Sequence, residues 1–343
     1  MNHYPSNVKE KLNSIILSMA EHHWLFSKNP GHDFTRQHLG KLSFYDTMRL
    51  IISMGKGSTN DEIMDYFNLD PDLIPSQSAF CQRRRQISLS AFEYLFSEFS
   101  SSFPSTTDKF KDHCILACDG CHVVYATNSD IIEDYNKPRL IDYKGYNHMH
   151  LNGFVDVISK AFLDVVIQPG QQPDEREALH SMLDHFTPDD PQKYIITADR
   201  GYESYDLLFH CEFKNLGYVF RVKSPSSPKS ILSYYASELP DDLEEFDVTI
   251  KRFFTDKATN IMKSQSDVYR YINPSKNTPH FYDLLRKKHS HLYFLQFRVV
   301  KIKTSENTYE YLITNLPFSF TLDDIRECYH WRWGIEISFC YLK

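Results

Sequence analysis

The first part of the chain, to about residue 110, has the hydrophobic pattern of helices. Between Val8 and Met19 the apolar residues recur every three or four positions, as they do on the buried face of a helix. Later segments repeat this pattern, and Ser43 and Ser88 stand just before two of them, where a hydroxyl commonly caps a helix. We therefore predict an all-helical N-terminal region, residues 1–110.

Beyond this region the pattern becomes that of strands. Two apolar runs each end in an aspartate, Asp119 in the first and Asp199 in the second. Between them, residues 150–167 hold two strand-like segments on either side of a short Ser-Lys turn. This arrangement predicts a hairpin between the two runs.

Helical patterns follow the hairpin, at 173–186, and the second apolar run, at 204–217. The resulting order of strand, strand, strand, helix, strand, helix, strand predicts an α/β domain of the ribonuclease H-like type. Strands joined by helices pair in parallel, and their carboxyl ends meet at one edge of the sheet, where ligands bind. We therefore expect Asp119 and Asp199 to lie together at that edge.

The last stretch of the chain predicts one helix that begins after Thr321, a good N-cap, and runs to the end. At about 100° per residue, four polar residues fall in one narrow sector of this helix. They are Tyr329, Arg332, Glu336 and Lys343. On the helix alone, a solvated face with incidental ion pairs is the favoured explanation of this stripe.

The spacing of the four residues, Y-x2-R-x3-E-x6-K, resembles the C-terminal catalytic helix of bacterial insertion-sequence transposases of the DDE type, specifically insertion sequence family four. Further matches to that family occur in order along residues 112–343. They are Asp119-Gly120, Gln168-Pro-Gly170 followed by Glu175 to Leu179, Asp199 to Tyr202, and Thr314 to Pro317.

The resemblance implies a catalytic domain over residues 111–343, with a β-rich insertion at about 224–311. It implies that Asp119, Asp199 and Glu336 are the catalytic carboxylates and hold two Mg²⁺ or Mn²⁺ ions. Oxygen ligands suit these ions, and the ions relieve the repulsion among crowded carboxylates. The DNA contacts that we expect are Tyr329, Arg332, Lys343 and Arg200.

The function implied is cleavage and strand transfer of the chain's own insertion sequence by two-metal-ion phosphoryl transfer. The expected partners are double-stranded DNA, as transposon terminal inverted repeats and target DNA, and a second copy of the chain in a homodimer. Two alternatives stay open. One is a metal-dependent DNA nuclease without strand transfer. The other is a truncated, inactive transposase that only binds DNA, because family members usually continue beyond the signature lysine, here Lys343.

Composition changes this picture little. The net charge of −7 argues mildly against nucleic-acid binding, although an acidic sum can hide a local basic groove. Seven scattered cysteines fit a reducing bacterial cytoplasm better than a disulfide framework. No apolar run approaches membrane-spanning length, so we expect no membrane partner.

Several other motifs have competing explanations. The basic segment Arg83 to Arg85 fits either a helix-turn-helix DNA reader or a plain helical bundle. Cys118 and Cys121 form a lone CxxC pair, which is weak support for zinc. His148 and His150 fit a structural role better than a metal site.

Two further segments toward the C-terminus also have competing explanations. Trp331 and Trp333 could stack on a flipped base, but core packing is the favoured interpretation. The charge run Arg286 to His289 fits either a DNA-backbone contact or a solvated surface.

Overall fold

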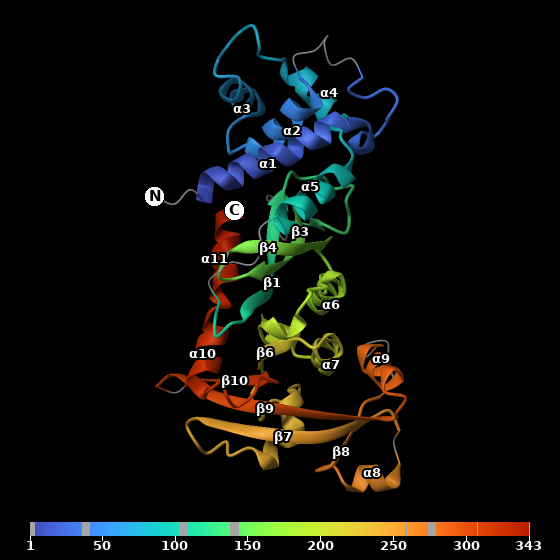
Figure 1. Cartoon of the computed structure of the whole chain (residues 1–343), viewed down its shortest axis with the longest axis vertical. Coiled ribbons are helices and arrows are strands. Elements are labelled where there is room, and N and C mark those ends of the chain that lie inside the picture. Colours follow the sequence, from blue (N-terminus) through green and yellow to red (C-terminus); the bar gives the residue numbers. More distant parts are fainter. Residues whose placement is uncertain are drawn as a thin grey trace. The chain divides into compact units, whose positions relative to one another are not determined.

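The computed structural model describes residues 4–35, 42–102, 109–137, 144–257, 259–273, 279–306 and 308–342. The chain divides into two compact units, Met1–Pro104 and Ser105–Lys343. Each unit has its own hydrophobic core and is described by itself (Figure 1).

The described part of the first unit is helical, as predicted. Its α-helices are α1 (Tyr4–Glu21), α2 (Phe44–Ser53), α3 (Thr59–Tyr66), α4 (Gln77–Gln86) and α5 (Leu89–Ser101). Ser43 caps α2 in a capping box with Asp46, because each side chain accepts a hydrogen bond from the backbone of the other. The buried face of α1, which includes Ile16 and Met19, packs against apolar residues of α2 and α5.

Within the described part of the second unit, ten strands form one mixed sheet. The order is β2-β3-β1-β5-β6-β10-β9-β7-β8, with β4 paired to β3. The strands are β1 (Cys114–Tyr125), β2 (Tyr135–Asn136), β3 (Tyr146–Asp156), β4 (Ala161–Pro169), β5 (Tyr194–Ala198), β6 (Gly217–Val222), β7 (Phe246–Thr255), β8 (Tyr269–Tyr271), β9 (Leu292–Ser305) and β10 (Thr308–Thr314).

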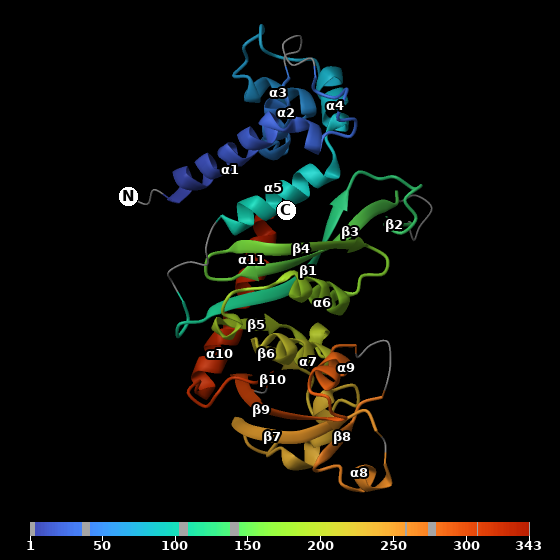
Figure 2. The ribbon, with the colours of Figure 1, turned by 45° about the vertical axis from the view of Figure 1, so that its right-hand side comes forward.

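The predicted ribonuclease H-like order is present in five of these strands. The run β4-β3-β1 is antiparallel, and β5 and β6 continue it in parallel with β1. Helix α6 (Glu175–His185) leads into β5, and α7 (Tyr205–Lys214) joins β5 to β6. The β-rich stretch that follows extends this sheet. Strand β10 pairs with β6 on one side and with β9 on the other, and β7 pairs with the far side of β9 (Figure 2).

Helices cover both faces of the sheet, and the alternation along β1 shows which residues face which layer. Leu116 and Cys118 pack into the cluster that contains residues of α6 and α7. Ile115 and Ala117 point the other way, into the cluster formed with α10 (Leu322–His330) and α11 (Trp333–Leu342). Figure 1 shows these two helix pairs on opposite sides of the strands.

The prediction of one uninterrupted C-terminal helix is wrong. Thr321 does cap the first part, α10, in a capping box with Asp324. The helix is then interrupted at Trp331 and Arg332, where backbone bonds close tighter three-residue turns, including Arg332 N to Tyr329 O at 3.0 Å. Because a three-residue turn advances each residue by about 120° rather than about 100°, the simple helical projection does not hold across the interruption.

The end of α7 also differs from the sequence prediction. The helical pattern was expected to reach residue 217, but α7 ends at Lys214 and is followed by Asn215 in the left-handed conformation, with φ of 56°. Asparagine tolerates this conformation better than most residues, so it substitutes for glycine as the helix terminator. Gly217 instead begins β6.

Candidate active site at the edge of β1 and β5

The parallel pairing of β1 and β5 places the two candidate aspartates side by side. The last pair in register is Cys118 with Ala198, so Asp119 and Asp199 follow at neighbouring positions. Asp119 does not lie at a strand end, contrary to prediction, since β1 continues to Tyr125 with β3 as its partner. Both aspartates follow residues that face α6 and α7, so alternation directs both toward α10 and α11.

Asp199 is held by groups from β6 and α10. Its Oδ1 atom lies 3.4 Å from Nη1 of Arg221 and accepts a hydrogen bond of 3.3 Å from the hydroxyl of Tyr329. Arg221 also pairs with Glu310 of β10 at 3.2 Å. Burial, opposed by Arg332, raises the pKa of Tyr329, so its phenol is neutral and donates.

Arg332 joins the first aspartate to the glutamate. Its Nη1 atom lies 3.4 Å from Oδ2 of Asp119, and its Nη2 atom lies 2.9 Å from Oε1 of Glu336. The whole residue is only 4% exposed, and its guanidinium also lies near the rings of Tyr329 and Trp333. All three predicted carboxylates are therefore connected through one short segment, Tyr329 to Glu336.

The electrostatics of this cluster favour a cation. Burial raises the pKa of Asp119, and the nearby Glu175 and Glu336 carboxylates raise it further. The Gly120 N–H and Arg332 oppose this shift without cancelling it. Carboxylate oxygens that repel one another in a half-buried site are the ligand type that Mg²⁺ and Mn²⁺ prefer, so these residues fit such ions.

A fourth carboxylate, Glu175, lies beside this site and was not predicted as a site residue. Its Oε1 atom is 3.3 Å from Nε2 of the buried His150. Gly120, next to Asp119, and Gly201, two residues after Asp199, leave space for the Glu175 side chain. A Cβ atom on Gly120 would lie 2.9 Å from Oε1 of Glu175, and one on Gly201 would lie 3.1 Å from Oε2. The glycine near each aspartate was the sequence signal for this close approach.

Arg200, Trp331 and Trp333, which the sequence also singled out, make no described contact with the three carboxylate groups. Arg200 is exposed in a short 3-10 turn directly after Asp199. Lys343 lies outside the described residues. Trp331 and Trp333 are not packed in the core, contrary to the favoured prediction, since they are 39% and 53% exposed.

The competing motifs have structural roles in the molecule. Cys118 is fully buried and its Sγ donates a 3.5 Å hydrogen bond to the hydroxyl of Tyr202. His148 is held by Asn136 and by the carbonyl of Gly170. These contacts give Cys118 and His148 structural partners.

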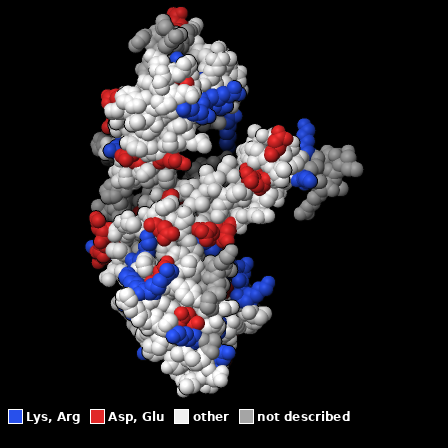
Figure 3. Space-filling view, turned by 90° about the vertical axis from the view of Figure 1, so that its right-hand side faces the viewer, with Lys and Arg blue, Asp and Glu red and all other residues white. Residues whose placement is uncertain are grey.

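The basic segments have local partners. Arg83 lies over the ring of Phe34 at 5.1 Å and Arg84 over that of Phe80 at 5.7 Å, while Arg286 pairs with Asp283. On the face shown in Figure 3, the described basic and acidic side chains are interspersed and form no continuous basic surface.

A ribonuclease H-like sheet that gathers carboxylates at the edge of β1 and β5 is typical of enzymes that cut and join nucleic acids. The chain belongs to the family described as the transposase DDE domain, which matches residues 110–343. The family is generally dependent on divalent metal ions.

Two other comparisons add little to this assignment. No curated protein matches the chain. Among solved structures it is similar to a piggyBac transposase in a synaptic complex with hairpin DNA, at 10% identity and a TM-score of 0.42. The similar region covers 85% of this chain and 55% of the piggyBac chain. No helix in the described ranges is both long and apolar enough to cross a membrane.

Proposed function

We propose that this protein is a transposase of the insertion sequence family four type, which cuts DNA at the ends of its own element and joins them to target DNA. The observation that carries the proposal is the register of β1 and β5, which aligns Asp119 with Asp199 on the face that α11 covers. Glu336 comes from that helix and is linked to Asp119 through Arg332.

Asp119, Asp199 and Glu336 would hold two Mg²⁺ or Mn²⁺ ions. When bound, such ions activate the attacking oxygen and stabilise the leaving oxygen at phosphorus. The chain's own residues fix the ligands. The sheet positions both aspartates, the Tyr329 hydroxyl orients Asp199, and Arg332 keeps Glu336 directed toward Asp119. These contacts pre-organise the carboxylates, so little rearrangement precedes phosphoryl transfer.

Three of the proposed DNA contacts, Arg200, Tyr329 and Arg332, lie near the same edge. Arg200 is exposed beside Asp199 and can form the forked pair that guanidinium makes with phosphate. Tyr329, Arg332 and Lys343 are proposed contacts through the family resemblance. The exposed Trp331 and Trp333 offer rings on which an unpaired base could stack.

Double-stranded DNA, as terminal inverted repeats and target, is the proposed substrate. A homodimer is the proposed assembly, because joining two element ends to one target requires two sites. The all-helical first unit is a proposed DNA-binding region, with the exposed Arg84 and Arg85 of α4 as its candidate contacts.

The test combines the purified protein, Mg²⁺, DNA that carries the sequences flanking its gene, and a supercoiled target plasmid. We expect cleavage at the element ends and joined products. Asp119→Ala and Glu336→Gln should each abolish both reactions, whereas Glu327→Gln, which alters an exposed acid on α10, should retain them. Cleavage without joining would support a metal-dependent nuclease instead. Full activity of Asp119→Ala would refute the assignment.

A further inference from the structure

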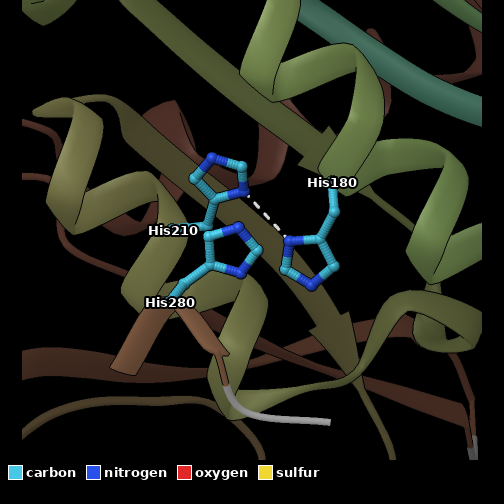
Figure 4. A group of neighbouring side chains, drawn as sticks. All are labelled: His180, His210 and His280. Carbon is cyan, nitrogen blue, oxygen red and sulfur yellow. Dashed lines mark hydrogen bonds between the residues drawn. The ribbon is translucent and has the colours of Figure 1, made fainter. Parts of the chain in front are cut away.

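Three histidines from distant parts of the sequence meet on the side of the sheet that α6 and α7 cover. His180 comes from α6, His210 from α7 and His280 from α9 (Pro279–Lys287), and Figure 4 shows their rings gathered together. One ring nitrogen from each lies within 4.8 Å of one from each of the others. His210 is 1% exposed, and the side chains of His180 and His280 are 11% and 14% exposed.

Carboxylates lie against the outer nitrogens of all three rings. Asp206 Oδ2 is 3.4 Å from Nε2 of His180 and 2.8 Å from Nδ1 of His280. Asp184 Oδ1 is 3.2 Å from Nε2 of His210. Histidines that bind metals usually direct the second ring nitrogen to a carboxylate in this way, which fixes the tautomer and the ring orientation.

The inner nitrogens are then left facing one another. Nδ1 of His180 and Nδ1 of His210 are 2.9 Å apart. If each ring donates its one proton outward to its carboxylate, both Nδ1 atoms present lone pairs across this short distance. Two facing lone pairs repel unless a cation lies between or beside them, and Nε2 of His280 points to the same place in Figure 4.

An additional proton fills this role poorly. Burial and the neighbouring His280 together lower the pKa of His180 to about 4, although Asp206 and Asp184 oppose this shift. Burial likewise lowers the pKa of His210 to about 2, with added repulsion from His280, His180 and Lys214. Both rings are therefore neutral near pH 7, which is the form that binds metals.

We propose that His180, His210 and His280 form a binding site for one Zn²⁺ ion, separate from the carboxylate site at the edge of β1 and β5. Imidazole nitrogens suit zinc, and oxygen-preferring Mg²⁺ is a poor match for them. Zinc–nitrogen bonds of about 2.0–2.1 Å place ligand atoms roughly 3.3 Å apart in a tetrahedron. The two Nδ1 atoms need to separate only slightly from their 2.9 Å distance, and the near-parallel rings need to turn.

The consequence of binding is structural. Helix α9 belongs to the β-rich insertion, whereas α6 and α7 belong to the ribonuclease H-like part. An ion held by all three helices fastens the insertion to the layer that supports β1 and β5. Asp206 already makes part of this connection, because its Oδ1 atom accepts a 3.1 Å hydrogen bond from Phe281 N.

The test begins with the full chain stripped of metal by a chelator and then titrated with Zn²⁺ against a chromophoric competitor. We expect one tight equivalent that excess Mg²⁺ does not displace, and Co²⁺ in its place should show the visible bands of tetrahedral coordination. Zinc should also raise the thermal midpoint of the stripped protein.

Variants separate this site from others. His280→Gln and His180→Gln should weaken zinc binding at least about 100-fold, and Asp184→Asn, at an exposed carboxylate, roughly 10-fold. His291→Gln, an exposed histidine of the same insertion, and Asp119→Asn should bind as the wild type does. Circular dichroism checks that each variant is folded. If a histidine variant does not fold, Asp184→Asn still tests the site, because it changes an exposed carboxylate. The proposal is wrong if the wild type takes up no tight equivalent, or if the histidine variants retain it.

Discussion

Replacing Arg332 with glutamine tests whether its buried charge holds the carboxylates together. The guanidinium is the cation between Asp119 and Glu336, at 3.4 and 2.9 Å, and the residue is 4% exposed. Arg332→Gln keeps a hydrogen-bond donor of reduced reach but removes the charge. The two carboxylates then repel each other, and Asp119 in particular lacks compensation for its burial.

The expected loss follows from the burial of the partners. Removing one member of a fully buried ion pair costs about 3–5 kcal/mol. The side chains of Asp119 and Glu336 are 23% and 38% exposed, so water screens part of the repulsion and Glu336 can turn outward. We therefore expect the free energy of unfolding to fall by about 2 kcal/mol.

Urea unfolding followed by circular dichroism measures this loss, with a chelator present and then with excess Mg²⁺. Divalent ions should restore part of the stability of Arg332→Gln and stabilise it more than they stabilise the wild type, because they supply the missing positive charge. The matched control is Arg326→Gln on α10, whose side chain is 39% exposed and pairs with Asp323 and Glu245. Its loss should stay below about 1 kcal/mol.

Two results would refute this reasoning. One is a loss for Arg332→Gln no larger than that of the Arg326 control, which would mean that the guanidinium is not the charge that compensates the acids. The other is an equal effect of Mg²⁺ on the variant and the wild type, which would mean that the ion does not bind among these carboxylates.

Three further outcomes are expected. Asp119→Asn should raise the free energy of unfolding of the chelator-treated protein at neutral pH. Because the pKa of Asp119 is raised in the folded state, the wild type has stability at low pH that it loses as the pH rises through that pKa. The advantage of Asp119→Asn should therefore vanish when urea unfolding is measured at acid pH. Gly120→Ala should cost about 1–3 kcal/mol in urea unfolding, because its Cβ would lie 2.3 Å from Nε2 of His150, whereas Gly31→Ala meets nothing within 4 Å and should be neutral. Arg298→Met should lower the free energy of unfolding by about 3 kcal/mol, and with it the thermal midpoint, because it leaves Asp247 and two carbonyls without their donor. A variant with the stability of the wild type would contradict this.

The sequence predicted the central sheet well because its signals are local. Buried strands that are separated by helices must pair in parallel, and aspartates at the ends of their apolar runs then meet. The register that aligns Asp119 with Asp199 follows from this pattern with little further information. The sequence left open whether β1 continues past Asp119, since that depends on β3 remaining as a partner after β5 ends.

Contacts between layers could not be predicted in the same way. Glu175 reaches the site only because glycines leave space for it, and hydrophobic periodicity carries no record of such space. The meeting of His180, His210 and His280 depends on how α6, α7 and α9 pack, which no spacing along the chain encodes. The exposed faces of Trp331 and Trp333 depend on the interruption between α10 and α11, because an unbroken helix would rotate them differently.

The β-rich insertion contributes directly to the placement of Glu336. Arg298 on β9 donates hydrogen bonds to the carbonyls of Leu316 and Pro317, at 3.2 and 2.9 Å, just before α10 begins. Asn315 donates to the carbonyl of Leu216 and accepts from the backbone N–H of Tyr218, which ties the same segment to the start of β6. The helix that carries the third carboxylate therefore starts from a point fixed by both the insertion and the ribonuclease H-like strands. An insertion between the second and third acidic residues does not loosen the site, because its strands continue the sheet that holds the first two.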